Sequence, residues 1–371
     1  MSHCWKTLGL VAALAISAPA MAATDPDAAL AALQGKVLST GPNGEQPVSP
    51  DSVSLTPEEV AKVQAMKARA AIVMHYSGND WSQAQIAGLK DGFRKLGIDV
   101  IAVTDAGFKP EQQVSDIETV MARKPNIIVS IPTDPVATAN AYEAAAKQGV
   151  KLVFMDNVPK GMKPGADYVS VVSADNYGNG VVSAHLMAKA LHGKGQIGLV
   201  YHAADFFVTK QRYVAFKKTI TENYPDIKIV AEQGIGGPDF SGEAERVASA
   251  MLTAHPRLNG IWAVWDVPAE GVISAARAAG RESSFVITTM DLGQNVAINM
   301  AQGDFVKGLG AQRPFDQGET EALLAAYGLL GKKAPDYVAW PALGVTRANL
   351  LQAWESVYHV PAPQGVRDSM K

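Results

Sequence analysis

Side chains that could hold a hydroxylated molecule stand directly after, or close behind, short apolar runs of this sequence. They combine carboxylates, amides, a guanidinium and large aromatic rings, namely Trp81, Gln83, Asp156, Asn157, Arg212, Phe240, Trp265, Asp291 and Gln312. Carboxylate and amide oxygens accept hydrogen bonds from hydroxyl groups, guanidinium and amide N–H groups donate to them, and aromatic faces stack on C–H surfaces. The set predicts non-covalent binding of a small polyhydroxylated ligand, with no metal or cofactor.

Each of these residues also has a simpler interpretation. Asp80 and Asp291 could cap helices, and Asp156 could end a strand in an Asx turn. Arg212 could be a solvated residue at the start of a helix, and Phe206 and Phe207 could belong to the core. The prediction of a binding site therefore depends on the joint pattern.

Catalytic alternatives find little support in the motifs. The sequence contains no His-Glu-x-x-His, no Gly-x-Ser-x-Gly and no Gly-x-Gly-x-x-Gly after an apolar run. A pair such as Asp156 and Asp291 could serve as acid and base in glycoside cleavage, so a glycoside-processing enzyme stays an alternative. The histidines lack the spacing of metal ligands, and we expect surface or capping positions for His75, His185, His192, His202, His255 and His359.

Two series of apolar runs supply the elements that must position these side chains. The first lies at 70–74, 100–103, 127–131 and 152–155, and the second at 197–201, 227–230, 261–264 and 285–289. Amphipathic segments between the runs predict helices at 83–96, 110–123, 135–148, 210–222, 243–253 and 269–279. Runs that are apolar on both faces and separated by helices are typical of parallel sheets. The predicted fold class is α/β, with two doubly wound parallel-sheet units whose ligands bind beyond the carboxyl ends of the strands.

The ends of the chain and its charge indicate an exported protein. Lys6 precedes an apolar run that ends in Ala20-Met21-Ala22, so residues 1–22 read as a signal peptide cleaved after Ala22. Cleavage would remove Cys4, the single cysteine, which excludes disulfides in the mature chain. A formal charge of −3 without a basic block argues against nucleic acid and anionic lipid as partners.

Residues 23–67 precede the first apolar run and are interpreted as an N-terminal arm with one short helix. Thr56-Pro57-Glu58-Glu59 predicts the start of that helix, because Thr56 can cap it, Pro57 suits its first position and Glu59 can reach back to the cap.

Five fragments of the sequence carry a resemblance to a known family. They are Ala87-Gly88-Leu89-Lys90-Asp91-Gly92, Ile131-Pro132-Thr133-Asp134, Phe154-Met155-Asp156-Asn157, Ser173-Ala174-Asp175-Asn176 and Leu252-Thr253-Ala254-His255-Pro256. These fragments keep the order and rough spacing that they have in the ribose-binding protein and its relatives, the type I periplasmic sugar-binding proteins of ABC transporters. The chain resembles this family from about Ala70 to Thr346.

The resemblance implies two lobes joined by a three-segment hinge, with the ligand in the cleft between them. The implied division is 68–174 plus 313–342 for the N-terminal lobe, 175–312 plus 343–358 for the C-terminal lobe, and 359–371 for a tail. The family's ligand-holding positions fall on Asp156, Arg212, Phe240, Asp291 and Gln312. Asn157 stands where the ribose binder has arginine, Trp265 replaces an asparagine, and the first loop differs in having Trp81, Gln83 and Gln85. A ligand other than ribose is therefore expected.

The implied function is capture of a neutral monosaccharide or sugar alcohol by lobe closure, and its delivery to an ABC permease in the inner membrane. We expect a periplasmic monomer that is not an enzyme. A periplasmic sugar receptor for a sensor kinase or chemoreceptor stays an alternative. A related transcription regulator would need a helix-turn-helix headpiece, for which residues 23–67 offer one helix.

Overall fold

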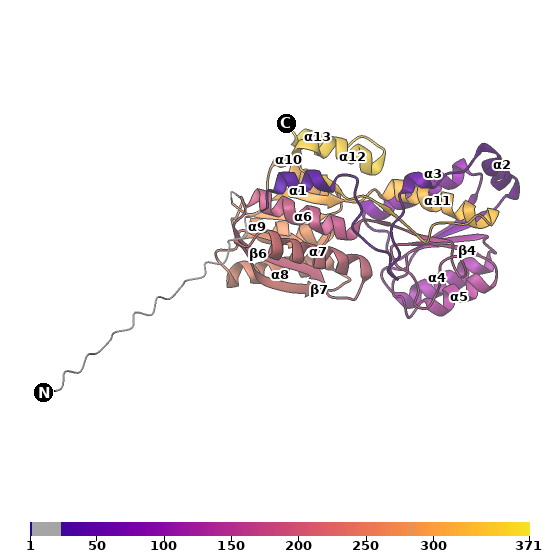
Figure 1. Ribbon diagram of the computed structural model, residues 1–371, viewed down its shortest axis with the longest axis horizontal. Helices are drawn as coiled ribbons and strands as arrows, with labels where there is room; N and C mark the ends of the chain where they lie inside the picture. Colours follow the sequence, from indigo (N-terminus) through magenta and orange to yellow (C-terminus); the bar gives the residue numbers. More distant parts are fainter. Residues whose placement is uncertain (2–23, 283) are drawn as a thin grey trace.

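Two α/β lobes of similar size lie side by side in the computed structural model of the protein (Figure 1). The structure describes residue 1 and residues 24–282 and 284–371. The predicted signal peptide and its cleavage site therefore lie outside the described residues, apart from Met1.

The first lobe is built on a six-stranded parallel sheet in the order β11-β5-β4-β3-β1-β2. Its strands are β1 (Arg69–Met74), β2 (Asp99–Asp105), β3 (Ile127–Ser130), β4 (Lys151–Met155), β5 (Ser170–Ala174) and β11 (Tyr337–Trp340). One face of the sheet is covered by α3 (Asp80–Lys95) and α11 (Pro314–Leu330), and the other by α4 (Pro110–Ala122) and α5 (Ala139–Lys147).

The second lobe repeats this arrangement in the order β12-β10-β9-β8-β6-β7, with only the short edge strand β12 antiparallel. Its strands are β6 (Gly195–His202), β7 (Ile227–Ile235), β8 (Gly260–Ala263), β9 (Val286–Met290), β10 (Val306–Ala311) and β12 (Leu343–Val345). Its helices are α6 (Asn176–Ala190), α7 (Phe207–Asn223), α8 (Phe240–Ala254), α9 (Asp266–Ala278), α10 (Gln294–Gln302), α12 (Leu350–Tyr358) and α13 (Gln364–Ser369).

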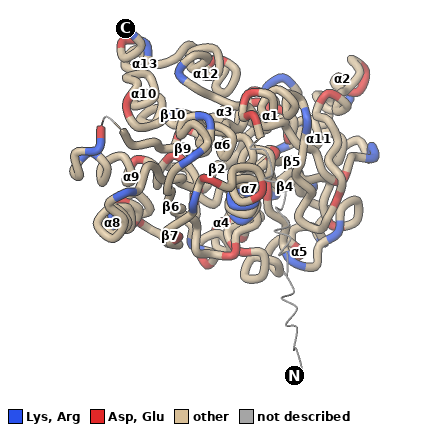
Figure 2. Tube along the Cα trace, turned by 60° about the vertical axis from the view of Figure 1, so that its left-hand side comes forward, with Lys and Arg blue, Asp and Glu red and all other residues tan. Residues whose placement is uncertain are grey.

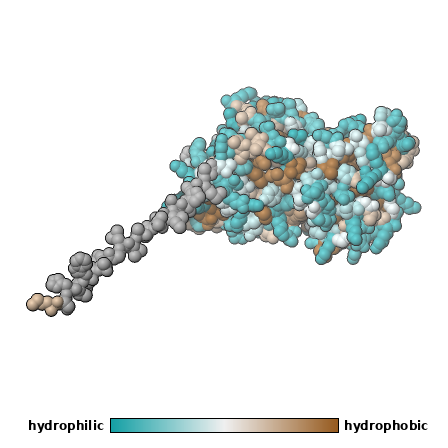
Figure 3. Space-filling model, viewed as in Figure 1, coloured by the Kyte–Doolittle hydropathy of each residue, from teal (hydrophilic) through white to brown (hydrophobic). Residues whose placement is uncertain are grey.

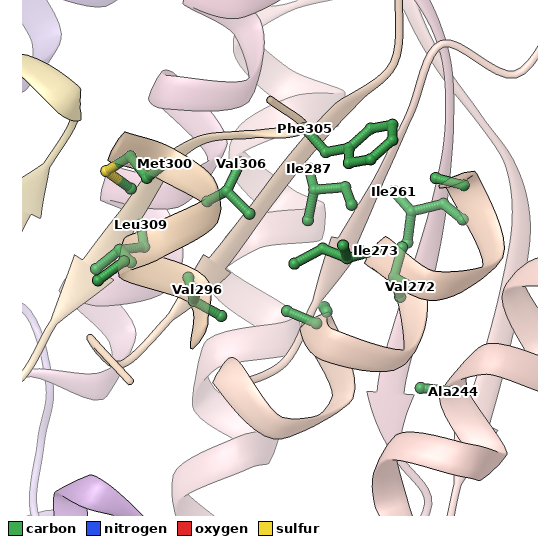
Figure 4. Packing of buried hydrophobic residues seen from close by; sticks show 14 of the residues in the cluster. Ala244, Ile261, Val272, Ile273, Ile287, Val296, Met300, Phe305, Val306 and Leu309 are labelled. Carbon is green, nitrogen blue, oxygen red and sulfur yellow. The ribbon is translucent and has the colours of Figure 1, made fainter. Parts of the chain in front are cut away.

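Apolar side chains fill the space between sheet and helices on both faces of the second lobe. Figure 4 shows the larger of its two clusters, in which Ile261 and Ile287 of the sheet pack against Val272 of α9 and Val296 of α10. Burial on both faces explains why these strands read as continuous apolar runs rather than alternating ones. It also makes each lobe a rigid body on which loops can be held in place.

All eight predicted strands are present, and four further strands, β5, β10, β11 and β12, escaped the sequence interpretation. Strand β10 lacks an apolar run because Gly308 and Gly310 lie against α6, where a Cβ at Gly310 would stand 2.8 Å from the Asn179 carbonyl oxygen. The helix predicted at 135–148 is shorter, because the Asp134 carboxylate accepts hydrogen bonds from the backbone N–H groups of Val136 and Ala137 and holds a turn there.

The arm contains more regular structure than predicted. The expected helix is α2 (Pro57–Met66), which has the Thr56/Glu59 capping box. A second helix, α1 (Pro26–Leu33), starts behind the Asp25 cap, and a 3-10 turn spans Pro50–Ser52. The prediction of a single helix was therefore wrong, because the alanine-rich segment 26–33 buries no side chain and has little apolar periodicity to mark it.

The chain passes between the lobes three times after the arm. The crossings lie between β5 and α6, between β10 and α11, and between β11 and β12. Basic and acidic residues are interspersed along the described part of the chain (Figure 2). On the face seen in Figure 3, hydrophilic residues dominate and hydrophobic ones occupy small areas, including some near the junction of the lobes.

Candidate functional site

A cavity of about 280 Å³ lies between the lobes, beyond the carboxyl ends of both sheets. Seven of the nine predicted site residues line it, namely Trp81, Asp156, Arg212, Phe240, Trp265, Asp291 and Gln312. They come from loops or helix starts that follow β1, β4, β6, β7, β8, β9 and β10. The two sheets therefore present their carboxyl ends to one shared space.

Gln83 and Asn157 do not line the cavity, in contrast to the sequence prediction. The Gln83 side chain is exposed and donates a hydrogen bond to the Ser77 carbonyl oxygen (2.6 Å). Asn157 is buried and donates to the Pro132 carbonyl oxygen (3.2 Å), so it supports the neighbouring loop. Both residues follow strands, but their side chains are directed elsewhere by local hydrogen bonds.

Asp156 and Asp291 occupy matching positions in the two lobes. Each directly follows a strand, β4 or β9, and has a left-handed backbone with φ of 55° and 62° respectively. This conformation is uncommon for residues with a Cβ, and Asp and Asn tolerate it best. The N–H group of each is held by the neighbouring strand, Asp156 by the Val172 carbonyl and Asp291 by the Gly310 carbonyl, both at 2.9 Å.

Arg212, Asp291 and Gln312 form a hydrogen-bonded group on the cavity wall. Arg212 Nη1 lies 3.0 Å from Asp291 Oδ2, and Gln312 Nε2 donates to Asp291 Oδ1 (2.8 Å). Arg212 Nε donates to the Asn176 side-chain oxygen (2.9 Å), which fixes the plane of the guanidinium. The pair is almost fully buried, so each charge is compensated mainly by the other.

Asp156 stands apart from this group. It accepts a hydrogen bond from the Ser173 hydroxyl and makes no ion pair within the described chain. Burial raises its pKa to about 6, although the Ser173 hydrogen bond and the Arg212 charge oppose the rise. At neutral pH Asp156 is therefore a largely ionised acceptor beside the cavity.

Aromatic rings make up much of the remaining wall. Besides the predicted Trp81, Phe240 and Trp265, the cavity is lined by His75, Tyr76, Phe108, His202 and Phe206. Phe108 of the first lobe packs edge-on against Phe240 of the second (5.5 Å between centroids), and Phe206 of the second stacks with His75 of the first (6.2 Å). The rings therefore bridge the lobes as well as line the cavity.

The expectation of surface or capping positions was wrong for three histidines. His75 and His202 line the cavity, and His185 is buried against the Tyr224 hydroxyl (2.7 Å). Burial lowers the pKa of His75 to about 4 and also lowers that of His202, so both rings are neutral at pH 7. His75 follows β1 directly and His202 ends β6, so the rule applied to the other strand ends could have found them.

Neither a metal site nor a membrane span emerges from the part of the chain that the structure describes. Across its described ranges, no group of three or more His, Cys, Asp or Glu side chains is placed to hold a metal ion. No helix within those ranges has the length and apolar character needed to cross a bilayer.

Comparisons with known proteins identify the family of the chain. The profile of the periplasmic binding protein domain matches residues 70–333. The chain is 28% identical over 231 residues to the D-ribose/D-allose-binding protein of Pseudomonas aeruginosa, covering 61% of this chain and 71% of the relative. It is 27% identical over 259 residues to a D-apiose import binding protein of Actinobacillus succinogenes, covering 69% and 80% respectively. Among solved structures, a periplasmic solute-binding protein of an ABC transporter from Actinobacillus succinogenes with bound D-allose superposes with a TM-score of 0.69 at 25% identity, covering 76% of this chain and 99% of that one.

Proposed function

The chain belongs to the periplasmic binding protein family, and from this membership we propose that it is the solute-binding component of an ABC importer, which encloses one neutral monosaccharide or sugar alcohol between its lobes. We further propose that it works as a monomer in the periplasm and delivers the sugar to a membrane permease.

The cavity between the lobes carries the proposal. Its volume of about 280 Å³ lies just below the usual range for small-molecule sites, which suits one monosaccharide better than an oligosaccharide. Carboxylates, a guanidinium and an amide can accept from and donate to hydroxyl groups, while the rings can stack on the C–H faces of a sugar.

The charges of the cavity favour a neutral ligand. Arg212 is the only Lys or Arg among the residues that line the cavity, and Asp291 already compensates it. An anionic ligand would approach Asp156 and Asp291 without gaining an uncompensated cation. We therefore place sugar acids below neutral sugars as candidates.

Capture would couple recognition to closure. Asp156 and Trp81 belong to the first lobe, and Arg212, Phe240 and Asp291 to the second, so an open form offers only part of the contacts. Bringing the lobes together completes the contacts and expels water. Micromolar affinity, on the order of −8 kcal/mol, requires only a few well-formed hydrogen bonds and one or two stacked rings.

A thermal-shift and calorimetry screen of the purified chain tests this function. The panel contains D-ribose, D-allose, D-apiose, D-arabinose and allitol, with sugar acids and amino acids as contrasts. A ligand that binds only the folded form raises the melting temperature, so we expect a shift with at least one neutral sugar or polyol. Shifts with amino acids alone, or chemical conversion of a bound sugar, would overturn the proposal.

Variants of the lining residues sharpen the test. We expect Arg212→Ala and Asp291→Ala to abolish the sugar-induced shift and each to cost about 3 to 5 kcal/mol of stability, because each leaves a buried charge unpaired. Gln312→Leu removes an amide without exposing a bare charge to the core, and should weaken binding while the fold persists. Gln83→Ala is the matched control, because Gln83 lies outside the cavity and should bind as the unaltered chain does. Unchanged binding by the Arg212, Asp291 and Gln312 variants would show that the site lies elsewhere.

A further inference from the structure

The arm, residues 24–67, precedes the segment that the family profile matches and contacts both lobes. Helix α1 lies along α6 of the second lobe, and α2 lies at the far end of the first lobe (Figure 1). On the second lobe, the Thr24 N–H donates to the Asn223 carbonyl oxygen (3.2 Å) and Asp27 pairs with Lys189 (2.5 Å).

The later part of the arm is anchored on the first lobe. Val48 joins the edge of the sheet by exchanging backbone hydrogen bonds with Tyr337 (3.0 Å) and Ala339 (3.2 Å) of β11. Val53 and Val63 are buried in the core cluster of that lobe. The arm therefore forms a fourth connection between lobes that the chain already joins three times.

Between these anchors the arm is fastened to the hinge itself. Asp175, the fully buried N-cap of α6, stands at the first crossing. It accepts hydrogen bonds from the Leu38 N–H (2.8 Å), the Ser39 N–H (2.8 Å) and the Ser39 hydroxyl (2.7 Å). The Ser39 oxygen in turn accepts from the Tyr177 N–H (3.0 Å).

Asp175 depends on the arm for most of its partners. Of its four hydrogen-bond donors, three belong to the arm and only the Gly178 N–H belongs to its own helix. A buried carboxylate without such donors is costly, so the arm is an integral part of the hinge rather than an appended tail. The Asp175 N–H also donates to the Trp340 carbonyl oxygen (2.8 Å), which links the arm and the first crossing to the third.

We propose that the arm is a strap across the hinge, fastened at Ser39 and Asp175, which restricts how far the two lobes separate in the ligand-free protein. This inference rests on the proposed function in one respect, because it assumes that the lobes close around a ligand. A strap that removes the most open arrangements leaves less conformational freedom to be lost on closing, and so tightens binding.

Cutting the strap while keeping both anchors tests the proposal. A protease recognition sequence is inserted at the exposed turn of Asn43 and Gly44, between the Ser39 contact and the Val48 strand. Spin labels on Glu118→Cys of α4 and Glu245→Cys of α8, both exposed, report the distance between lobes. The same sequence inserted at Arg281 and Glu282, within one lobe, is the matched control. The distance distribution is measured without sugar, before and after cleavage, so it is independent of which sugar binds.

We expect cleavage in the arm to broaden the distribution toward longer distances, and cleavage at the control position to leave it unchanged. Calorimetry with D-allose and D-apiose should give a dissociation constant that rises about 2- to 10-fold after the arm is cut, the size of effect that one hydrogen bond supplies. Ser39→Ala removes the hydroxyl that bonds Asp175 and Tyr177 but keeps the two backbone donors, so it should broaden the distribution in the same direction and by less than the cut. Identical distributions before and after cutting, together with an unaltered Ser39→Ala protein, would overturn the strap. Failure of every sugar to bind would instead overturn the proposed function and leave the distance measurement to decide the strap.

Discussion

At the scale of single residues, the site depends on carboxylates held in unusual environments. Asp291 is compensated by Arg212, whereas Asp156 is buried with only neutral partners in contact. A buried charge of this kind lowers the stability of the folded protein, and in the proposed function it would accept hydrogen bonds from the hydroxyl groups of the sugar. The two residues are alike in sequence context, yet they contribute differently to stability.

The raised pKa of Asp156 predicts a pH-dependent contribution to stability. Because the folded-state pKa of about 6 lies above the ordinary value of 3.8, the contribution is fully present at low pH and is lost as the pH rises from about 4 through 6. The loss should be on the order of 2 to 3 kcal/mol, and Asp156→Asn should remove it. Urea denaturation of both proteins between pH 4 and pH 7.5 measures the difference. If the free energies of unfolding of the unaltered protein and of Asp156→Asn changed in parallel with pH, the raised pKa would not belong to Asp156.

At the scale of elements, two helices of the first lobe meet at glycines. A Cβ at Gly88 of α3 would lie 2.0 Å from the Phe315 carbonyl oxygen of α11, and a Cβ at Gly318 would lie 2.5 Å from the Gln85 carbonyl oxygen. Since α11 begins two residues after Gln312, this close packing also determines where Gln312 enters the cavity.

We expect Gly88→Ala to destabilise the protein by about 1 to 3 kcal/mol, because the methyl group meets rigid backbone and the helices must move apart. Gly365→Ala in α13 is the matched control. Its new methyl group would be 3.5 Å from Ile298, an ordinary contact, so the change should be neutral or stabilising by up to about 1 kcal/mol. Chemical denaturation midpoints of the two variants decide the matter. If both variants changed the stability equally, α3 and α11 would be able to move apart at Gly88 at little cost.

At the scale of the whole molecule, contacts outside the cavity also join the lobes. The Asp80 carboxylate of α3 accepts a hydrogen bond from the Gln294 N–H at the start of α10 (2.7 Å). Asp80 was considered as a helix cap from the sequence, and it does act as one, but for a helix of the opposite lobe. On α10 itself, Gly293 occupies the N-cap position and has no side chain to cap with.

Because separating the lobes would break this contact, we expect Asp80→Ala to weaken sugar binding. A helix cap contributes about 0.5 to 2 kcal/mol, which corresponds to a 2- to 30-fold rise in the dissociation constant. Asp134→Ala removes the same charge from a turn within one lobe and serves as the control. Calorimetry with the tightest-binding sugar of the panel compares them. An equal loss of sugar affinity in both variants would mean that removing a negative charge, and not the contact between the lobes, weakens binding.

The sequence determined the fold class and seven of the side chains that line the cavity. Strands buried on both faces must be apolar throughout, so runs such as 127–131 and 261–264 were recognisable without any knowledge of the structure. Parallel strands end at one edge of their sheet, which is why side chains found after separate runs, such as Asp156 and Asp291, lie around one cavity.

Tertiary structure decided which of the neighbouring side chains face that cavity and how the lobes are joined. Trp81 lines the cavity and Gln83 does not, because the Gln83 amide is held by the Ser77 carbonyl. Ser39 reaches Asp175 across 136 positions of sequence, a contact that no local pattern encodes. Side-chain direction in loops and contacts between distant segments depend on the packing of whole lobes, whereas the apolar patterns that predict helices and strands involve residues only a few positions apart.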